Sequence, residues 1–403
     1  MMTLYLIGRV WDKMKKNKII SIVFCIIIVF CIIMLLITGC TSSNIDNKND
    51  IIVKENTQIV KEFNNINMVI DPRIELLSVI IYLSSDYDEN TKSIVPSDSS
   101  YKKDVEAYFG KYKNHKVVNM FNLSLASRGF SYDAPPTAML FLTNTPNLTL
   151  REDIDKSDYM YIQCMERAGG EKQFLKFVEE LNKFCDETNF YEFYNEHLEY
   201  YNKIIDNTID NLEDIDYVAQ VQNYYGKEQG GYNIVLSGML YANNYGPKIK
   251  NENGSYDLYS ILGSNGISND LPMFSDDFYF KYIVRHEFGH SFVNYLATEN
   301  IDEVNKSAKL YGPIKTAMQQ QAYSTWETCL NEHIVRAVVI RIIDIYGAKE
   351  EVNEYLKMEK ECSFVYVEDI IYLLKNKYEP NRDKYKTFED FYPEILKLLS
   401  ELV

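Results

Sequence analysis

The sequence predicts an α+β fold that is mostly helical and contains one small sheet. Segments with apolar residues at helical spacing recur along the chain, and the region that starts at Tyr232 has the pattern of two short strands. The chain has 403 residues, of which 46% are hydrophobic and 25% are charged. A chain of this length and composition can bury a sizeable core as one large domain.

Five segments are expected to form helices. In the second segment Val105, Tyr108 and Phe109 recur at helical spacing, and in the fourth Ser275 precedes two aspartates, which is a typical helix start. The five segments are Arg73–Ile81, Tyr101–Tyr112, Phe174–Phe184, Ser275–Leu296 and Tyr323–Tyr346.

The expected sheet lies in the middle of the chain. Tyr232–Leu236 and Met239–Tyr241 have the composition of two strands, with Ser237-Gly238 as the turn between them. Asn243–Pro247 is rich in turn residues and is expected to end the unit.

The N-terminus has the organisation of a targeting segment. Four lysines precede an apolar run over Ile19–Ile37, and the run closes with Ile37-Thr38-Gly39-Cys40. These last four residues resemble the bacterial lipobox, in which the cysteine receives a diacylglyceryl group before cleavage. We therefore expect a signal peptide over residues 1–39 and a lipid on Cys40.

An uncleaved transmembrane anchor is the alternative, because a run of this length also spans a bilayer. In both cases the lysines stay inside, which places the domain outside the cytoplasm. We expect the outer face of a bacterial cell membrane, of the Gram-positive kind.

Residues 40–65 are rich in Ser, Asn, Asp and Lys without strand or helix periodicity, as is typical of a flexible tether. The folded domain is expected over residues 66–403. The formal net charge of the whole chain is −16, although the first 39 residues are basic. Such an acidic surface repels phosphate backbones, so nucleic-acid binding is excluded as a function class.

Four cysteines remain in the expected mature chain: Cys164, Cys185, Cys329 and Cys362. An even number outside the cell permits disulfides, but the sequence does not choose among three pairings. Since none of them forms a CxxC pair, a cysteine metal site is not expected.

The expected helix over Ser275–Leu296 contains His286-Glu287-Phe288-Gly289-His290, an HExxH motif. Residues four apart project from one helix face, so both imidazoles can reach one ion while Glu287 reaches the water bound to it. Zinc suits such a site, because it binds imidazole and keeps an open position for water. Glu287 would then accept the proton of the water and deliver it to the leaving amine.

A third protein ligand is expected from a later helix. The metzincin pattern is excluded, because Val293 and Leu296 stand where it requires glycine and histidine. Glu327 and Glu332 lie five residues apart, so only one of them can face the metal. We favour Glu332, since Arg336 one turn later can pair with it and orient it; Glu327 is the alternative.

Asn331-Glu332 after the HExxH motif resembles the gluzincin arrangement. Most of the chain also resembles the bacterial family of domain of unknown function 4932. The resemblance implies a zincin-like metallopeptidase fold, with His286, His290 and Glu332 as ligands and Glu287 as the base; it implies no substrate. The resembling stretches are Asp71–Leu77, Tyr108–His115, Asn244–Gly246, His286–Asn294, Glu332–Ala337 and Tyr385–Phe391.

Two further features of a peptidase are expected. The ribbon over Tyr232–Tyr241 is a candidate edge strand for an extended peptide, although a plain hairpin is an equal interpretation. Candidate donors to a developing oxyanion, or residues that support the ligands, are Tyr323, Tyr245, His333 and Arg336. His115 and His197 are expected to be structural or solvated.

The sequence thus predicts a membrane-anchored, extracytoplasmic zinc peptidase with one Zn²⁺ per chain, a peptide or protein substrate and no nucleic-acid partner. Two alternatives remain open. One is a non-catalytic binding lipoprotein that keeps the fold, and the other is a zinc hydrolase of a different amide bond.

Overall fold

The computed structural model describes residues 57–84, 99–125, 129–240, 244–264, 266–274, 277–347 and 349–403. The expected signal peptide, the lipidated Cys40 and the helix cap Ser275 lie outside these residues. Among the helices of the described ranges, none combines the length and the apolar character that crossing a bilayer requires.

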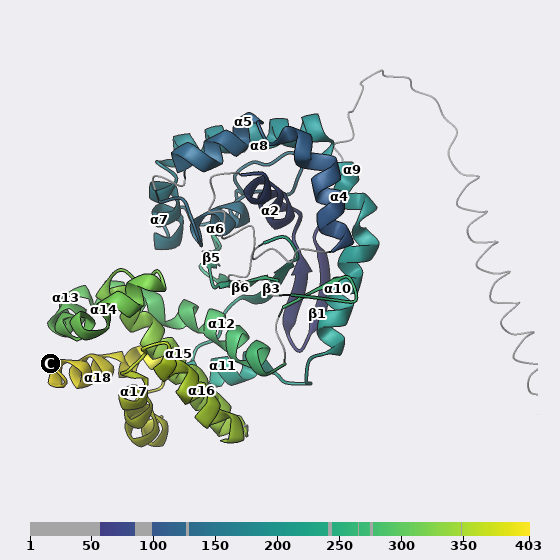
Figure 1. Cartoon of the computed structure of the whole chain (residues 1–403). Helices are drawn as coiled ribbons and strands as arrows, with labels where there is room; N and C mark the ends of the chain where they lie inside the picture. The colour runs from purple at the N-terminus through teal and green to yellow at the C-terminus, as the bar shows by residue number, and fades with distance from the viewer. Residues whose placement is uncertain are drawn as a thin grey trace, which may run out of the picture. The chain divides into compact units, whose positions relative to one another are not determined.

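The chain is mostly helical with a small mixed sheet, so the predicted α+β class is confirmed (Figure 1). The α-helices of the described ranges are α2 (Pro72–Leu83), α4 (Ser100–Phe109), α5 (Lys116–Asn119), α6 (Ala134–Leu140), α7 (Tyr159–Arg167), α8 (Glu171–Thr188), α9 (Phe190–Glu196), α10 (Leu198–Asp210), α11 (Tyr217–Tyr225), α12 (Asp277–Glu299), α13 (Ile301–Lys306), α14 (Tyr311–Gln320), α15 (Trp326–Tyr346), α16 (Lys349–Glu361), α17 (Val367–Leu373) and α18 (Phe388–Glu401). The strands are β1 (Ile59–Phe63), β2 (Ile66–Ile70), β3 (Gly231–Ser237), β4 (Asn244–Tyr245), β5 (Lys248–Lys250), β6 (Tyr256–Gly263), β7 (Gly266–Ser268) and β8 (Leu271–Met273).

The main sheet has the strand order β1-β2-β3-β6-β4, and β5 also pairs with β6. The strands β2, β3 and β6 run parallel, whereas β1, β4 and β5 pair antiparallel with their neighbours. The two short strands β7 and β8 form a separate hairpin.

The predicted hairpin around Ser237-Gly238 is wrong. Gly231–Ser237 forms the single strand β3, which pairs with β2 on one side and β6 on the other. Both of its partners are distant in sequence. β3 runs parallel to both, and Ile234–Ser237 are buried whichever face they point to, so a nearly continuous apolar run replaces the alternation of a hairpin. Residues 239–240 are not in a strand, and Tyr241 lies outside the described ranges.

The predicted tether is too long at its C-terminal end. β1 lies at Ile59–Phe63, and its residues pair antiparallel with Ile66–Ile70. Lys61 and Glu62 are polar, so the sequence of this segment has no clear strand periodicity. It becomes a strand because it pairs with β2 in the tertiary structure. Order therefore begins before Ile66.

The expected helices are confirmed with shifted ends. α2 and α8 contain the first and third predicted segments, and α12 contains most of the fourth. In the second, α4 ends at Phe109 and a 3₁₀ helix follows over Gly110–Tyr112. The fifth begins at Trp326 rather than Tyr323, because the side chain of Thr325 accepts a hydrogen bond from the backbone N–H of Thr328 and caps the helix.

The two faces of the sheet are covered by different helices. Ser237 Oγ donates a hydrogen bond of 2.6 Å to Glu75 of α2, whereas the Tyr232 ring lies 5.1 Å from that of Phe288 in α12. Side chains five residues apart on a strand point to opposite faces. α2 and α12 therefore pack on opposite sides of β3 and β6.

α2 is buried on all sides and carries charged residues into the core. Arg73 donates to both carboxylate oxygens of Asp71 at 2.9 and 2.6 Å, which pairs this buried charge. Glu75 forms no ion pair with any residue of the described ranges. It accepts hydrogen bonds from Ser237 and Tyr101, and burial raises its pKa to about 7 although both hydroxyl groups oppose the shift.

Replacing Glu75 with glutamine should flatten the pH dependence of stability. The ordinary carboxyl pKa is 4.5 and the folded value is about 7, so folding takes up a proton between these values. The free energy of unfolding of the wild type should therefore fall by up to about 3 kcal/mol relative to Glu75→Gln as the pH rises from about 5 to about 8. Urea unfolding at both pH values measures this difference.

The matched control is Glu166→Gln, which changes an exposed glutamate. It should leave the pH dependence unchanged. A Glu75→Gln variant with the same pH dependence as the wild type would show that Glu75 is ionised in the folded protein.

Candidate metal centre

Two helices form the candidate metal centre, and a glycine allows them to approach. His286, Glu287 and His290 lie on α12, and Glu332 lies on α15, which packs against it. A Cβ atom at Gly289 would lie 3.1 Å from Val335 Cγ1 and 3.0 Å from Tyr225 Oη. Gly289, which lies between the two histidines, therefore allows α15 to pack closely against α12.

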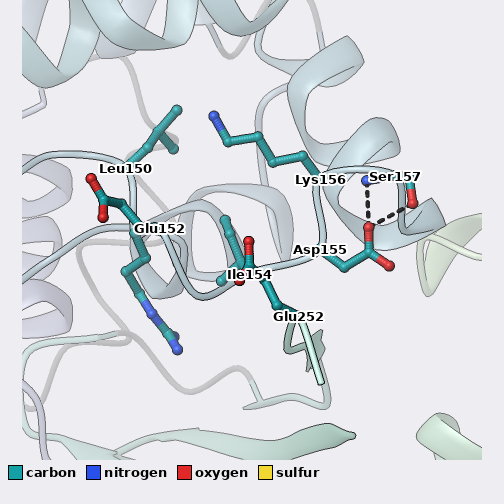
Figure 2. A pocket seen from close by; sticks show the side chains of 8 residues that line it. Leu150, Glu152, Ile154, Asp155, Lys156, Ser157 and Glu252 are labelled. Atoms are coloured by element: carbon teal, nitrogen blue, oxygen red, sulfur yellow. Dashed lines mark hydrogen bonds between the residues drawn. The ribbon is translucent and has the colours of Figure 1, made fainter. Parts of the chain in front are cut away.

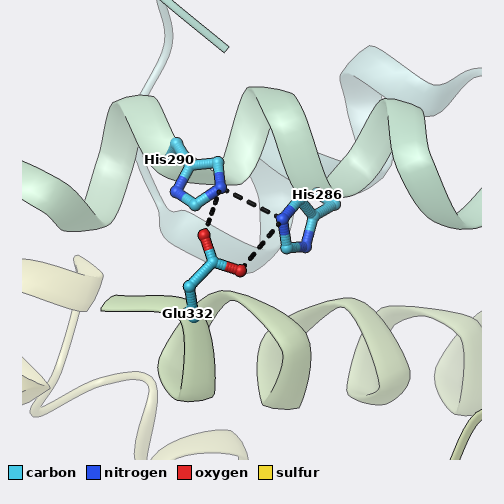
Figure 3. Close-up of side chains that lie close together, drawn as sticks. All are labelled: His286, His290 and Glu332. Carbon is cyan, nitrogen blue, oxygen red and sulfur yellow. Dashed lines mark hydrogen bonds and ion pairs between the residues drawn. The ribbon is translucent and has the colours of Figure 1, made fainter. Parts of the chain in front are cut away.

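The side chains of His286, His290 and Glu332 converge (Figure 3). Each offers one ligand atom, and these atoms lie within 4.8 Å of one another. The two Nε2 atoms are 3.1 Å apart, and Glu332 Oε2 and Oε1 lie 3.5 and 3.3 Å from those of His286 and His290. Such a set of two imidazoles and one carboxylate can hold a metal ion.

The structure distinguishes between the two glutamates. Glu332 points at the histidines and is 7% exposed. Glu327 instead accepts a hydrogen bond of 2.7 Å from Thr298 Oγ1 and is not part of the group. The five-residue separation predicted that only one of them faces the site, and Glu332 is that residue.

The protonation states favour ligation. Burial lowers the pKa of His286 well below its ordinary value, which keeps this imidazole neutral. Burial alone would raise the pKa of Glu332, but His290, His286 and Arg336 outweigh it and lower the pKa to about 2. Arg336 is the permanent charge among these three. A neutral imidazole and an ionised carboxylate are the forms that bind metals.

His290 is oriented by a neighbour one turn later on α12. Its Nδ1 lies 3.1 Å from Asn294 Oδ1. A proton on Nδ1 that is donated to this oxygen leaves the lone pair of Nε2 directed at the site. Asn294 was not predicted, although its spacing of four residues from His290 is a usable signal.

A ring of side chains supports the ligands from behind. Arg336 donates to Glu332 Oε2 from Nε at 3.2 Å and from Nη2 at 3.0 Å, and its Nη1 donates to Glu359 Oε2 at 2.8 Å. Tyr282 donates to the other oxygen of Glu359, and its ring stacks on His286 with centroids 5.8 Å apart. The pairing of Arg336 with Glu332 was predicted from their spacing. Glu359 was missed, because α16 approaches α15 only in the tertiary structure. The role of Tyr282 was also missed, although this residue lies four positions before His286 on α12.

Glu287 lies beside the ligands and is 5% exposed. Burial raises its pKa to about 7, against the opposing effect of His290. Gly246, which follows β4, lies so close that a Cβ atom there would be 2.4 Å from the Glu287 carbonyl oxygen and 2.9 Å from Oε2. Glycine is needed at this position because any side chain would displace Glu287.

The strand segment beside the site is therefore β4 and not the predicted ribbon over Tyr232–Tyr241. β3 is an interior strand with both edges paired, so it has no free edge for a peptide. β4 is the last strand in the order of the main sheet and pairs with β6 through Asn244 and Tyr245.

The four candidate oxyanion donors differ in position. Tyr323 precedes α15, is partly buried and interacts with Arg336, Glu332 and Glu287. Tyr245 lies in β4, and Arg336 is engaged by two carboxylates. His333 is fully buried and bonds through Nδ1 to the carbonyl of Cys329 at 2.7 Å, so it is a core residue.

The other histidines and the cysteines have structural roles. His115 accepts a hydrogen bond from the Val117 N–H and caps α5, and His197 bonds to the Phe193 carbonyl. The four cysteines of the expected mature chain are all free, so the structure contains none of the three disulfide pairings.

Another hollow on the surface shares no residue with the metal group (Figure 2). Asp155 in its wall accepts hydrogen bonds from Ser157 and pairs with Lys250 at 2.9 Å, and Arg151 pairs with Asp153 at 2.8 Å. These charges stabilise the loop before α7.

Comparison with known proteins identifies one family. The sequence model of the family described as Domain of unknown function (DUF4932) matches residues 66–398, which include the whole metal group. No curated protein matches the chain, and no solved structure does. Because the match covers far more than half of the chain, the protein belongs to the DUF4932 family.

Proposed function

We propose that the protein is a zinc-dependent peptidase. The observation that carries this proposal is the convergence of His286, His290 and Glu332 from two packed helices, with the buried carboxyl of Glu287 beside them. Two acceptor nitrogens 3.1 Å apart repel each other unless a cation or a proton lies between them. Burial disfavours the imidazolium form of His286, and two neutral imidazoles whose lone pairs point at one place suit a metal ion.

The donor set suits zinc. Two imidazoles and one carboxylate are a typical set for catalytic zinc with an open position. Zinc supplies Lewis acidity, which polarises a carbonyl group and acidifies water.

The residues of the chain have separate roles in this proposal. Glu287 accepts a proton from the attacking water and delivers it to the leaving amine, and a pKa of about 7 suits both transfers. Tyr323 is the favoured donor to the developing oxyanion, since its hydroxyl belongs to the same cluster. Arg336 positions Glu332, and the segment at β4 and Gly246 is the place for an extended peptide.

Zinc content tests the ligand assignment. The purified protein should contain about one zinc per chain by elemental analysis, and His290→Gln or Glu332→Gln should lose most of it because each removes one of three ligands. Glu327→Gln is the matched control on the same helix and should keep its zinc. A Glu332→Gln variant that binds zinc like the wild type, while Glu327→Gln does not, would reverse the assignment.

Glu287→Gln tests catalysis. The variant keeps the size of the side chain but has no basic oxygen for proton transfer, so cleavage of a fluorogenic peptide library should fall by about 10²–10⁴-fold with the zinc content unchanged. Cleavage at the wild-type rate would reject Glu287 as the base. A zinc-loaded wild type that cleaves no peptide would favour the binding lipoprotein or hydrolysis of another amide bond.

The proposed location is the outer face of a bacterial membrane, with a lipid on Cys40. The support is the order of lysines, apolar run and Ile37-Thr38-Gly39-Cys40. Cys40→Ser should abolish labelling of the protein by a radioactive fatty acid in cells, whereas Cys362→Ser should not. Equal labelling of both variants would exclude this anchor.

A further inference from the structure

A second cavity lies behind the metal-bearing helix. It has a volume of about 350 Å³ and is lined by residues from α11, α12, α15 and α16. Arg285 in its wall directly precedes His286, and successive residues of a helix point about 100° apart. The cavity and the metal group therefore use different faces of α12. Its principal lining residues are Gln220, Lys281, Arg285, Ile343, Tyr346 and Glu351.

Arg285 is a buried cation without an anion in contact. It is 3% exposed and forms no ion pair with any side chain that the structure describes. Nε and Nη2 donate to Gln220 Oε1, Nη1 donates to the Lys281 carbonyl, and the guanidinium lies 4.7 Å from the centre of the Tyr217 ring. These bonds use three of its five N–H groups, so two remain for a ligand.

The acidic residues of the cavity are directed at Lys281 instead. Its ammonium pairs with Glu213 at 3.0 Å and with Glu351 at 3.7 Å. The second carboxylate oxygen of Glu351, Oε2, is buried and finds no hydrogen-bond partner within the described ranges. The residues that line the cavity thus include Arg285, which has unused donors, and Glu351, which has an unused acceptor.

The remaining wall is apolar. Ile343 is 3% exposed, whereas Tyr346 at the end of α15 is 48% exposed and stands at the rim. A simple anion would satisfy Arg285 but leave Glu351 Oε2 unsatisfied. A ligand that carries both a carboxylate and an ammonium group satisfies both.

We propose that this cavity binds a free α-amino acid with an apolar side chain as a zwitterion. The carboxylate accepts from Arg285, the ammonium donates to Glu351 Oε2, and the side chain packs against Ile343 and Tyr346. A volume of about 350 Å³ is at the small end of ligand pockets and fits one residue better than a peptide. This site goes beyond the proposed peptidase function and does not need the metal.

Calorimetric titration of the full chain with L-leucine, in the presence of a chelator, tests the proposal. Leucine should bind saturably. 4-Methylpentanoate, which lacks the ammonium group, and 3-methylbutylamine, which lacks the carboxylate, should each bind at least roughly tenfold more weakly, because each leaves one buried charged partner unsatisfied. The absence of saturable leucine binding would overturn the proposal, as would equal binding of 4-methylpentanoate.

Two variants assign the contacts. Glu351→Gln should weaken leucine binding roughly tenfold but leave that of 4-methylpentanoate unchanged, whereas Glu350→Gln, at an exposed neighbouring position, should change neither. Arg285→Gln should abolish both; if it does not fold, Glu351→Gln carries the test. Equal affinities of Glu351→Gln and Glu350→Gln would overturn the assignment. Leucine binding without peptidase activity would leave this site standing while the proposed function fails.

Discussion

The close packing of α12 against α15 is the contact on which the candidate metal centre depends. Gly289 has no side chain, so Val335 and Tyr225 approach the helix backbone to distances that a Cβ atom would make too short. This approach brings Glu332 to the two histidines of α12. The HExxH spacing places two ligands on one helix face, but the third depends on this separate packing contact.

Burial makes the charges of the site interdependent. Glu332 remains ionised because Arg336 lies against it, and Glu359 balances Arg336 in turn. Tyr282 closes the ring by bonding to Glu359 and stacking on His286. Removing one member of such a buried network leaves its partner uncompensated, so α16 contributes to the metal centre without supplying a ligand.

The main sheet separates two buried polar clusters with different character. On the α12 side, Glu287 lies against Gly246 and near the three groups that could hold a metal ion. On the α2 side, Glu75 accepts hydrogen bonds from the hydroxyl groups of Ser237 and Tyr101 and forms no ion pair within the part of the chain that the structure describes. Burial raises the pKa of both carboxyl groups to about 7. The pKa therefore does not distinguish Glu287, the candidate base, from Glu75, a structural residue; their neighbouring groups do.

The local sequence pattern predicts the helices and part of the candidate site, whereas long-range packing decides the sheet and the remaining site residues. The helical class, the helix that carries His286 and His290, and the pairing of Glu332 with Arg336 follow from spacings of three and four residues, which helix geometry converts into a shared face. The single strand β3, the strand β1 within the expected tether, and the positions of Glu359 and Gly246 beside the site do not follow from local pattern. Strand partners and contacts between helices join residues far apart in the chain, and no local periodicity records which segments meet.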